Sequence, residues 1–98
     1  MPKPDPVHVE VFTISGPCPA FDATLAFLGV HGVPHTVSDL TPEFKRQFIR
    51  RGHALVPAVI LWLGEGQRRR RYFEWSGHRP PMLRIAATMA EASRQEAS

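Results

Sequence analysis

The spacing of apolar residues in the first half of the chain predicts two strands that alternate with two helices. Valines at every second position predict a strand over Val7–Thr13, because β-branched residues suit a pleated surface. Apolar residues at helical spacing predict a helix from about Pro19 to about His31. The next segments indicate a short strand at His35–Ser38 and a helix at Pro42–Arg51, for which Thr41 is a suitable cap.

The second half of the chain predicts a hairpin. Val56–Leu63 is almost continuously apolar, which is typical of a central strand buried on both faces. Gly64-Glu65-Gly66 supplies a turn, and Arg69–Trp75 returns as the partner strand, an arginine-rich edge of the sheet. Strict alternation would divide this return strand into one face with Arg69, Arg71, Phe73 and Trp75 and another with Arg70, Tyr72 and Glu74.

The end of the chain completes an α/β pattern. Ser76-Gly77 makes a turn, and a last helix is predicted from Pro80 to about Glu91 on the spacing of Met82, Ile85, Ala86 and Met89. The order β-α-β-α-β-β-α indicates a four-stranded mixed sheet with helices on both faces and a right-handed first crossover. We expect one domain over residues 1–98, with an extended lead-in at 1–6 and a frayed tail at 92–98.

Composition places the chain among globular proteins. Apolar residues make up 43% and charged residues 21%, and no apolar run approaches the roughly 18 residues of a membrane span. The proline-rich start does not resemble a secretory signal, so the cytoplasm is the expected compartment. A single cysteine cannot form an internal disulfide, and such a thiol persists best in a reducing compartment.

The net charge of +3 comes largely from a run of four arginines, Arg68–Arg71, with a second basic group around Lys45 and Arg51. Such a run could contact phosphates beside nearby aromatic residues, so nucleic-acid binding is one hypothesis. Alternation would split these arginines between two faces, however, and arginines on an edge strand also deter edge-to-edge pairing. We therefore expect no nucleic-acid partner, and Trp62 and Trp75 are interpreted as core or groove residues.

Cys18 is the main candidate for chemistry. It precedes the first predicted helix, where unpaired backbone N–H groups and the helix dipole favour the thiolate that acts as a nucleophile. The alternative is a small buried apolar residue. His53 could approach the thiol, or it could be a solvated residue at the end of the second helix. The five histidines lack metal-ligand spacing, so we expect no metal site and no cofactor.

Several motifs in the same order resemble the glutaredoxin family, most closely its NrdH-type redoxins. The most diagnostic is the segment Trp75 to Pro80, which is similar to a Trp-Ser-Gly-Phe-Arg-Pro segment of that group. The other matching segments are Phe12-Thr13, Cys18-Pro19-Ala20-Phe21, Asp22-Ala23-Thr24, Val37-Ser38-Asp39-Leu40 and Val56-Pro57. The resemblance covers about Val9 to Ala87 and implies a thioredoxin fold.

The same resemblance implies a cis peptide bond before Pro57 and a peptide or thiol substrate between Pro57 and Cys18. The implied substrate contacts come from Val56, Pro57, Phe21, Ser76 and Gly77. A protein disulfide or thiol is the implied substrate, with a ribonucleotide reductase or a thioredoxin reductase as possible partners. Ile14-Ser15 replaces the lysine that glutathione-binding members carry before the cysteine, which argues against a standard glutathione pocket.

Phe21 is the main departure, because it occupies the position of the second active-site cysteine. A dithiol redoxin resolves its mixed disulfide with that second thiol. Cys18 could instead act alone as a monothiol nucleophile, with an external thiol completing the exchange. The alternative is a degenerate thioredoxin-fold module that binds a protein partner without turnover, and a purely structural role for Phe21 fits either hypothesis.

Overall fold

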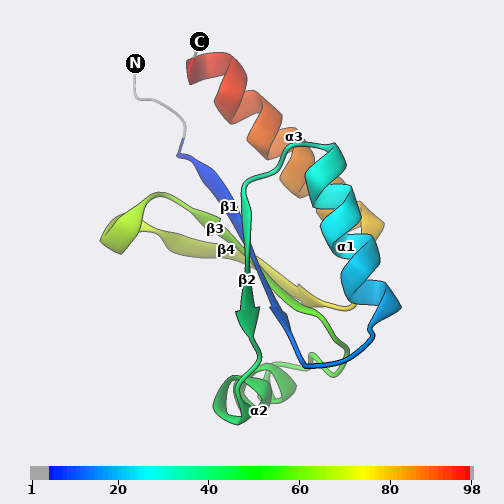
Figure 1. The fold of residues 1–98 in the computed structure, drawn as a ribbon. Coiled ribbons are helices and arrows are strands. Elements are labelled where there is room, and N and C mark those ends of the chain that lie inside the picture. Colours follow the sequence, from blue (N-terminus) through cyan, green and yellow to red (C-terminus); the bar gives the residue numbers. More distant parts are fainter. Residues whose placement is uncertain (1–4, 98) are drawn as a thin grey trace.

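The chain folds as predicted into a four-stranded sheet with three helices (Figure 1). The structure is a computed structural model that describes residues 5–97. Its elements are β1 (Val7–Thr13), α1 (Pro19–Val30), β2 (His35–Asp39), α2 (Pro42–Arg50), β3 (Ala58–Leu63), a short 3-10 turn η1 (Gly66–Arg68), β4 (Arg70–Ser76) and α3 (Pro80–Ala97). The predicted strands and helices are confirmed, most of them to within two residues.

The sheet is mixed, with the strand order β2-β1-β3-β4. β1 runs parallel to β2 and antiparallel to β3, and β4 pairs antiparallel with β3. β3 begins at Ala58 rather than at the predicted Val56. Pro57 has no N–H group to donate to a neighbouring strand, so β3 begins at the residue that follows it.

The two faces of the sheet bury separate apolar clusters, so helices do lie on both faces. α1 and α3 lie side by side over the first face (Figure 1) and cover Val9, Val11 and Leu61, each 0% exposed. On the second face Phe48 of α2 packs with Phe12 and Ile60. Thr41 caps α2 as predicted, since its Oγ1 accepts a hydrogen bond from the backbone N–H of Phe44 at 3.2 Å.

The last helix is longer than predicted, since α3 continues beyond the predicted end near Glu91 to Ala97. Arg94 fixes this part of the helix, because its Nη1 donates to the Gly32 carbonyl oxygen at 2.8 Å. Residue 98 and residues 1–4 of the predicted lead-in lie outside the described residues. Pro6 is tied to the sheet, since its carbonyl oxygen accepts from Gly64 N–H at 3.0 Å.

The division of β4 into two faces also differs from strict alternation. The register pairs Leu61 with Phe73 and Trp62 with Arg71, so Tyr72 is an extra residue in a β-bulge. Arg71 therefore shares the second face with Trp62, instead of the first face with Phe73 as alternation predicted. The bulge moves every residue before it to the opposite face from the one expected.

Candidate active site

Cys18 is the N-cap residue of α1. Its backbone is extended, with φ −148° and ψ 97°, and its carbonyl oxygen accepts the first helical hydrogen bond from Asp22 N–H at 3.0 Å. Pro19 takes the first helical position, where its missing N–H leaves no unpaired donor. The thiol is free and half-buried, and within the described chain it makes no capping hydrogen bond. It therefore lies at a helix N-terminus, as the sequence predicts.

The segment before β3 and the turn after β4 form one connected unit. The Val56-Pro57 peptide bond is cis, as the resemblance implied. Gly77 N–H donates to the Pro57 carbonyl oxygen at 2.8 Å, and Leu55 N–H donates to Ser76 Oγ at 3.4 Å. Pro57, Ser76 and Gly77 are buried, whereas Val56 is half-buried.

Gly77 allows this close approach. Its φ of +77° is a conformation that favours glycine, and a Cβ at this position would lie 3.0 Å from Cδ1 of Leu55. A larger residue would push Leu55 away from the turn. The Val56-Pro57 and Ser76-Gly77 pairs therefore depend on each other for their placement.

This unit lies at the end of the sheet from which the chain continues to Cys18. Phe12, near the end of β1, pairs with Ala58, and Ala58 pairs with Ser76. The loop to α1, the loop before β3 and the turn after β4 consequently leave the sheet at the same end (Figure 1). The register thus brings Cys18, Val56-Pro57 and Ser76-Gly77 to one end of the molecule.

Phe21 has a different placement from the other predicted site residues. It is half-buried and packs against the apolar cluster between the first face of the sheet, α1 and α3. The Phe21 side chain, at the position where the resemblance implies a second cysteine, is thus part of the packing of α1. This position cannot take part in thiol exchange.

His53 lies on the second face, where its Nε2 is 2.9 Å from Oε2 of Glu74. Arg51 Nε donates to the same oxygen at 2.6 Å. The interpretation of His53 as a solvated helix-end residue is wrong, because the ring is paired with Glu74 and lies edge-on to Phe48. Its Nε2 is directed to a carboxylate and not to a thiol.

A link between α1 and the β4–α3 turn is absent from the sequence-based prediction. Oγ1 of Thr24, a fully buried residue, is 3.1 Å from Nδ1 of His78. It joins the helix that carries Cys18 to the turn that carries Gly77. The sequence offered one signal for this contact, since His78 stands where the similar Trp-Ser-Gly-Phe-Arg-Pro segment has phenylalanine.

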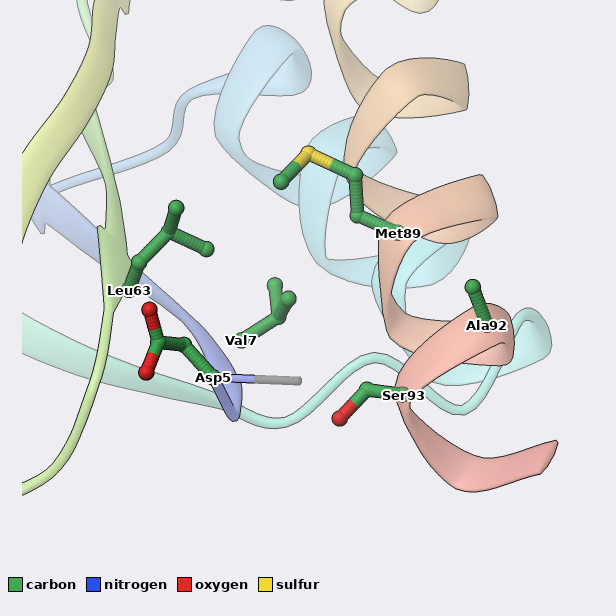
Figure 2. A pocket seen from close by; sticks show the side chains of 6 residues that line it. All are labelled: Asp5, Val7, Leu63, Met89, Ala92 and Ser93. Atoms are coloured by element: carbon green, nitrogen blue, oxygen red, sulfur yellow. The ribbon is translucent and has the colours of Figure 1, made fainter. Parts of the chain in front are cut away.

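Three further features of the described residues are relevant to the site. Within residues 5–97, no group of three His, Cys, Asp or Glu residues could hold a metal ion. No helix in the described part of the chain is long and apolar enough to span a membrane. A largely apolar cavity of about 230 Å³, into which Met89 projects, lies between α3 and the start of β1 (Figure 2). Val7 pairs with Leu63 there, so this cavity is at the opposite end of β1 from Cys18.

Comparison with known proteins supports the fold. No protein-family model matches the chain, and no curated protein matches it. Among solved structures, the solution structure of a thioredoxin from Thermus thermophilus is similar, with a TM-score of 0.51 and 18% sequence identity over 89% of this chain and 78% of that chain. At this identity the similarity concerns the fold alone, so the protein has a thioredoxin-like α/β fold.

Proposed function

We propose that this protein is a monothiol redoxin of the glutaredoxin or NrdH type, with Cys18 as its only nucleophile. The observation that carries the proposal is the position of Cys18 at the N-cap of α1, at the sheet end that also holds the linked Val56-Pro57 and Ser76-Gly77 pairs. A thiol at a helix N-terminus is favourably placed to react as a thiolate.

In the proposed reaction, the Cys18 thiolate attacks one sulfur of a substrate disulfide and releases the other sulfur as a thiolate. Phe21 has no thiol, so an external thiol attacks the Cys18 sulfur and releases the remaining substrate thiol. A second external thiol then frees Cys18 and leaves as a disulfide with the first. Two electrons pass from the two external thiols to the substrate disulfide.

The proposed substrate is a protein disulfide or thiol in the cytoplasm. We propose that the substrate segment lies against Val56, Pro57 and Gly77, because these residues and Cys18 lie at the same end of the sheet. A ribonucleotide reductase or a thioredoxin reductase is a partner proposed from the resemblance of Trp75-Ser76-Gly77-His78-Arg79-Pro80 to NrdH-type proteins.

The experiment mixes the protein with glutathione disulfide and measures the rate at which Cys18 forms a mixed disulfide. The increase in mass of the intact protein gives this rate. The reference is a synthetic peptide of residues 12–24, which has the same thiol and the same sequence neighbours without the fold. We expect the folded protein to react roughly tenfold faster or more, because thiolate character and access control the rate. Cys18→Ser is the labelling control, since it leaves no thiol in the chain. Equal rates for protein and peptide would remove the basis of the proposal.

The second candidate function is a partner-binding module without turnover, which the lack of a second thiol at Phe21 favours. Phe21→Cys distinguishes the two functions, with Phe21→Ser as a control of equal size that lacks the thiol. Both changes should cost about 1–3 kcal/mol of stability, because a half-buried ring is lost. If only the resolving thiol is missing, Phe21→Cys alone will reduce disulfides repeatedly with a thioredoxin reductase and NADPH. An inactive but folded Phe21→Cys variant would favour the binding module.

A further inference from the structure

The second face of the sheet is only partly covered. α2 has nine residues, so it is about 14 Å long at 1.5 Å per residue, and it covers the end of this face around Phe12 and Ala58. Next to it lies a groove with a volume of about 320 Å³, within the size range of small-ligand sites. The groove has an apolar floor that includes Phe12, Ile60 and Trp62.

Two arginines lie over the half-buried Trp62. The guanidinium carbon of Arg69 is 4.0 Å from the centre of the indole ring, and that of Arg71 is 5.6 Å away. Within the described chain, Arg69 has no carboxylate partner, and Arg71 reaches Glu74 only at 3.9 Å. Both charges are therefore available to an anion, while the indole holds the guanidinium planes in place.

The β-bulge at Tyr72 is responsible for this arrangement. Without it, the pairing of Leu61 with Phe73 would continue with Trp62 opposite Tyr72. The extra residue instead places Arg71 opposite Trp62, and Arg69 also reaches that face. The arginine run is still divided between the two faces, since Arg70 pairs with Leu63, but the bulge brings Arg69 and Arg71 to the face of Trp62.

A hydrogen-bond network fixes the other side of the groove. Glu10 accepts from Trp62 Nε1 at 3.1 Å through Oε1 and from Ser38 Oγ at 2.8 Å through Oε2. This network crosses β2, β1 and β3 and holds the indole ring in one orientation. Asp39, on β2, adds an exposed carboxylate at the same side. The Arg69 guanidinium and the Glu10 carboxylate thus contact the same indole ring, while the exposed Asp39 carboxylate lies on β2, at the opposite edge of the sheet from β4.

We propose that this groove binds a nucleotide, either free or as one unit of a single-stranded nucleic acid. The phosphate contacts Arg69 and Arg71, the planar base lies against the aromatic and guanidinium surfaces, and its amino group or the ribose hydroxyls face Asp39. A nucleotide carries its negative charge at one end, so its phosphate can lie beside Arg69 and Arg71 while its uncharged base lies toward Asp39. A peptide with several carboxylates would meet Glu10 and Asp39 across the floor.

The experiment titrates the full chain with AMP and, separately, with a single-stranded oligoadenylate, and follows tryptophan fluorescence. Trp62 is half-exposed and reports on the groove, whereas Trp75 is 2% exposed. Arg69→Gln and Arg71→Gln should each weaken binding about tenfold, because each removes a charge-assisted contact to phosphate. Arg84→Gln is the matched control, since Arg84 is an exposed arginine on α3, outside the groove. Thermal unfolding of each variant checks that it is folded.

Saturable AMP binding that depends on Arg69 and Arg71 but not on Arg84 would support a free nucleotide as the ligand. The same residue dependence with the oligonucleotide alone would assign the ligand to a nucleic acid. Absence of binding to either ligand at millimolar concentrations would overturn the proposal. Equal weakening by all three substitutions would also overturn it, because it would show general attraction of a basic protein for polyanions. Cys18→Ser leaves this test unchanged, so it is independent of the redox proposal.

Discussion

The two faces of the sheet are stabilised by different interactions. The first face is packed against α1 and α3, and its valines and leucines, together with Trp75, are at most 7% exposed. The second face is packed against a single short helix and continues into a groove with charged side chains and a half-buried tryptophan. Apolar burial holds the first face, whereas hydrogen bonds and arginine–indole contacts hold much of the second.

This difference separates stability from binding in one small domain. Burial of apolar surface is the largest favourable contribution to folding, so the first face should account for most of the stability. The second face leaves polar groups accessible, which favours ligand recognition. The candidate thiol site lies at the end of the sheet where Phe12, Ala58 and Ser76 adjoin.

The largest expected effect is on the first face. Leu61→Ala should lower the free energy of unfolding by about 3 kcal/mol, because Leu61 is 0% exposed and its removal leaves a cavity. Urea denaturation measures the change. The control is Val37→Ala, since Val37 on β2 is 49% exposed. A loss below about 1 kcal/mol for Leu61→Ala would mean that the first face does not dominate stability.

A smaller effect is expected at the helix that covers the second face. Thr41→Ala should cost about 1 kcal/mol, because it removes the side-chain cap on Phe44 N–H. Thr41→Ser keeps the hydroxyl and serves as the matched control. If the loss of stability is local, Thr41→Ala should accelerate hydrogen exchange more in α2 than in α1. Equal acceleration in both helices would mean that the two faces unfold together.

Trp62→Phe tests how far the groove contributes to stability. It removes the hydrogen bond from Nε1 to Glu10 but keeps an aromatic ring, so we expect a loss of about 0.5 kcal/mol at this half-exposed position. Urea denaturation again gives the value, with Tyr72→Phe as a control at an exposed aromatic residue. A loss of more than about 2 kcal/mol would place Trp62 in the core rather than in a binding surface.

The smallest expected effect is a pH dependence of stability at His8. Burial lowers the pKa of His8 from its ordinary value of 6.5; Glu10 opposes this shift, and Arg69 and His35 add to it. Because the unfolded chain takes up the proton first, stability should fall as the pH drops from 7 through 6.5, and the loss should level off below the folded pKa. Urea denaturation between pH 7 and 5 should show a flatter profile for His8→Asn than for the wild type. An unchanged pH slope of stability in His8→Asn would contradict this assignment. His31→Asn serves as the control.

The sequence predicted the position of the candidate site better than its contacts. Cys18 lies at the start of a helix, and the Val56-Pro57 bond is cis, as expected from local motifs and the resemblance. The contact between Thr24 and His78 and the pairing of His53 with Glu74 were not predicted. Each of these links residues more than 20 positions apart, so no local pattern encodes it.

The sequence by itself determined the order and approximate bounds of the strands and helices, the capped start of α2 and the placement of Cys18 at a helix N-terminus. These features depend on residue spacing and on turn and capping residues within a few positions, which the chain encodes locally. Only the tertiary structure decided that Tyr72 forms a bulge, that Arg69 and Arg71 lie over Trp62, and that Phe21 packs against the core. A bulge arises from how two strands pair, and a shift of one residue changes which face each side chain occupies.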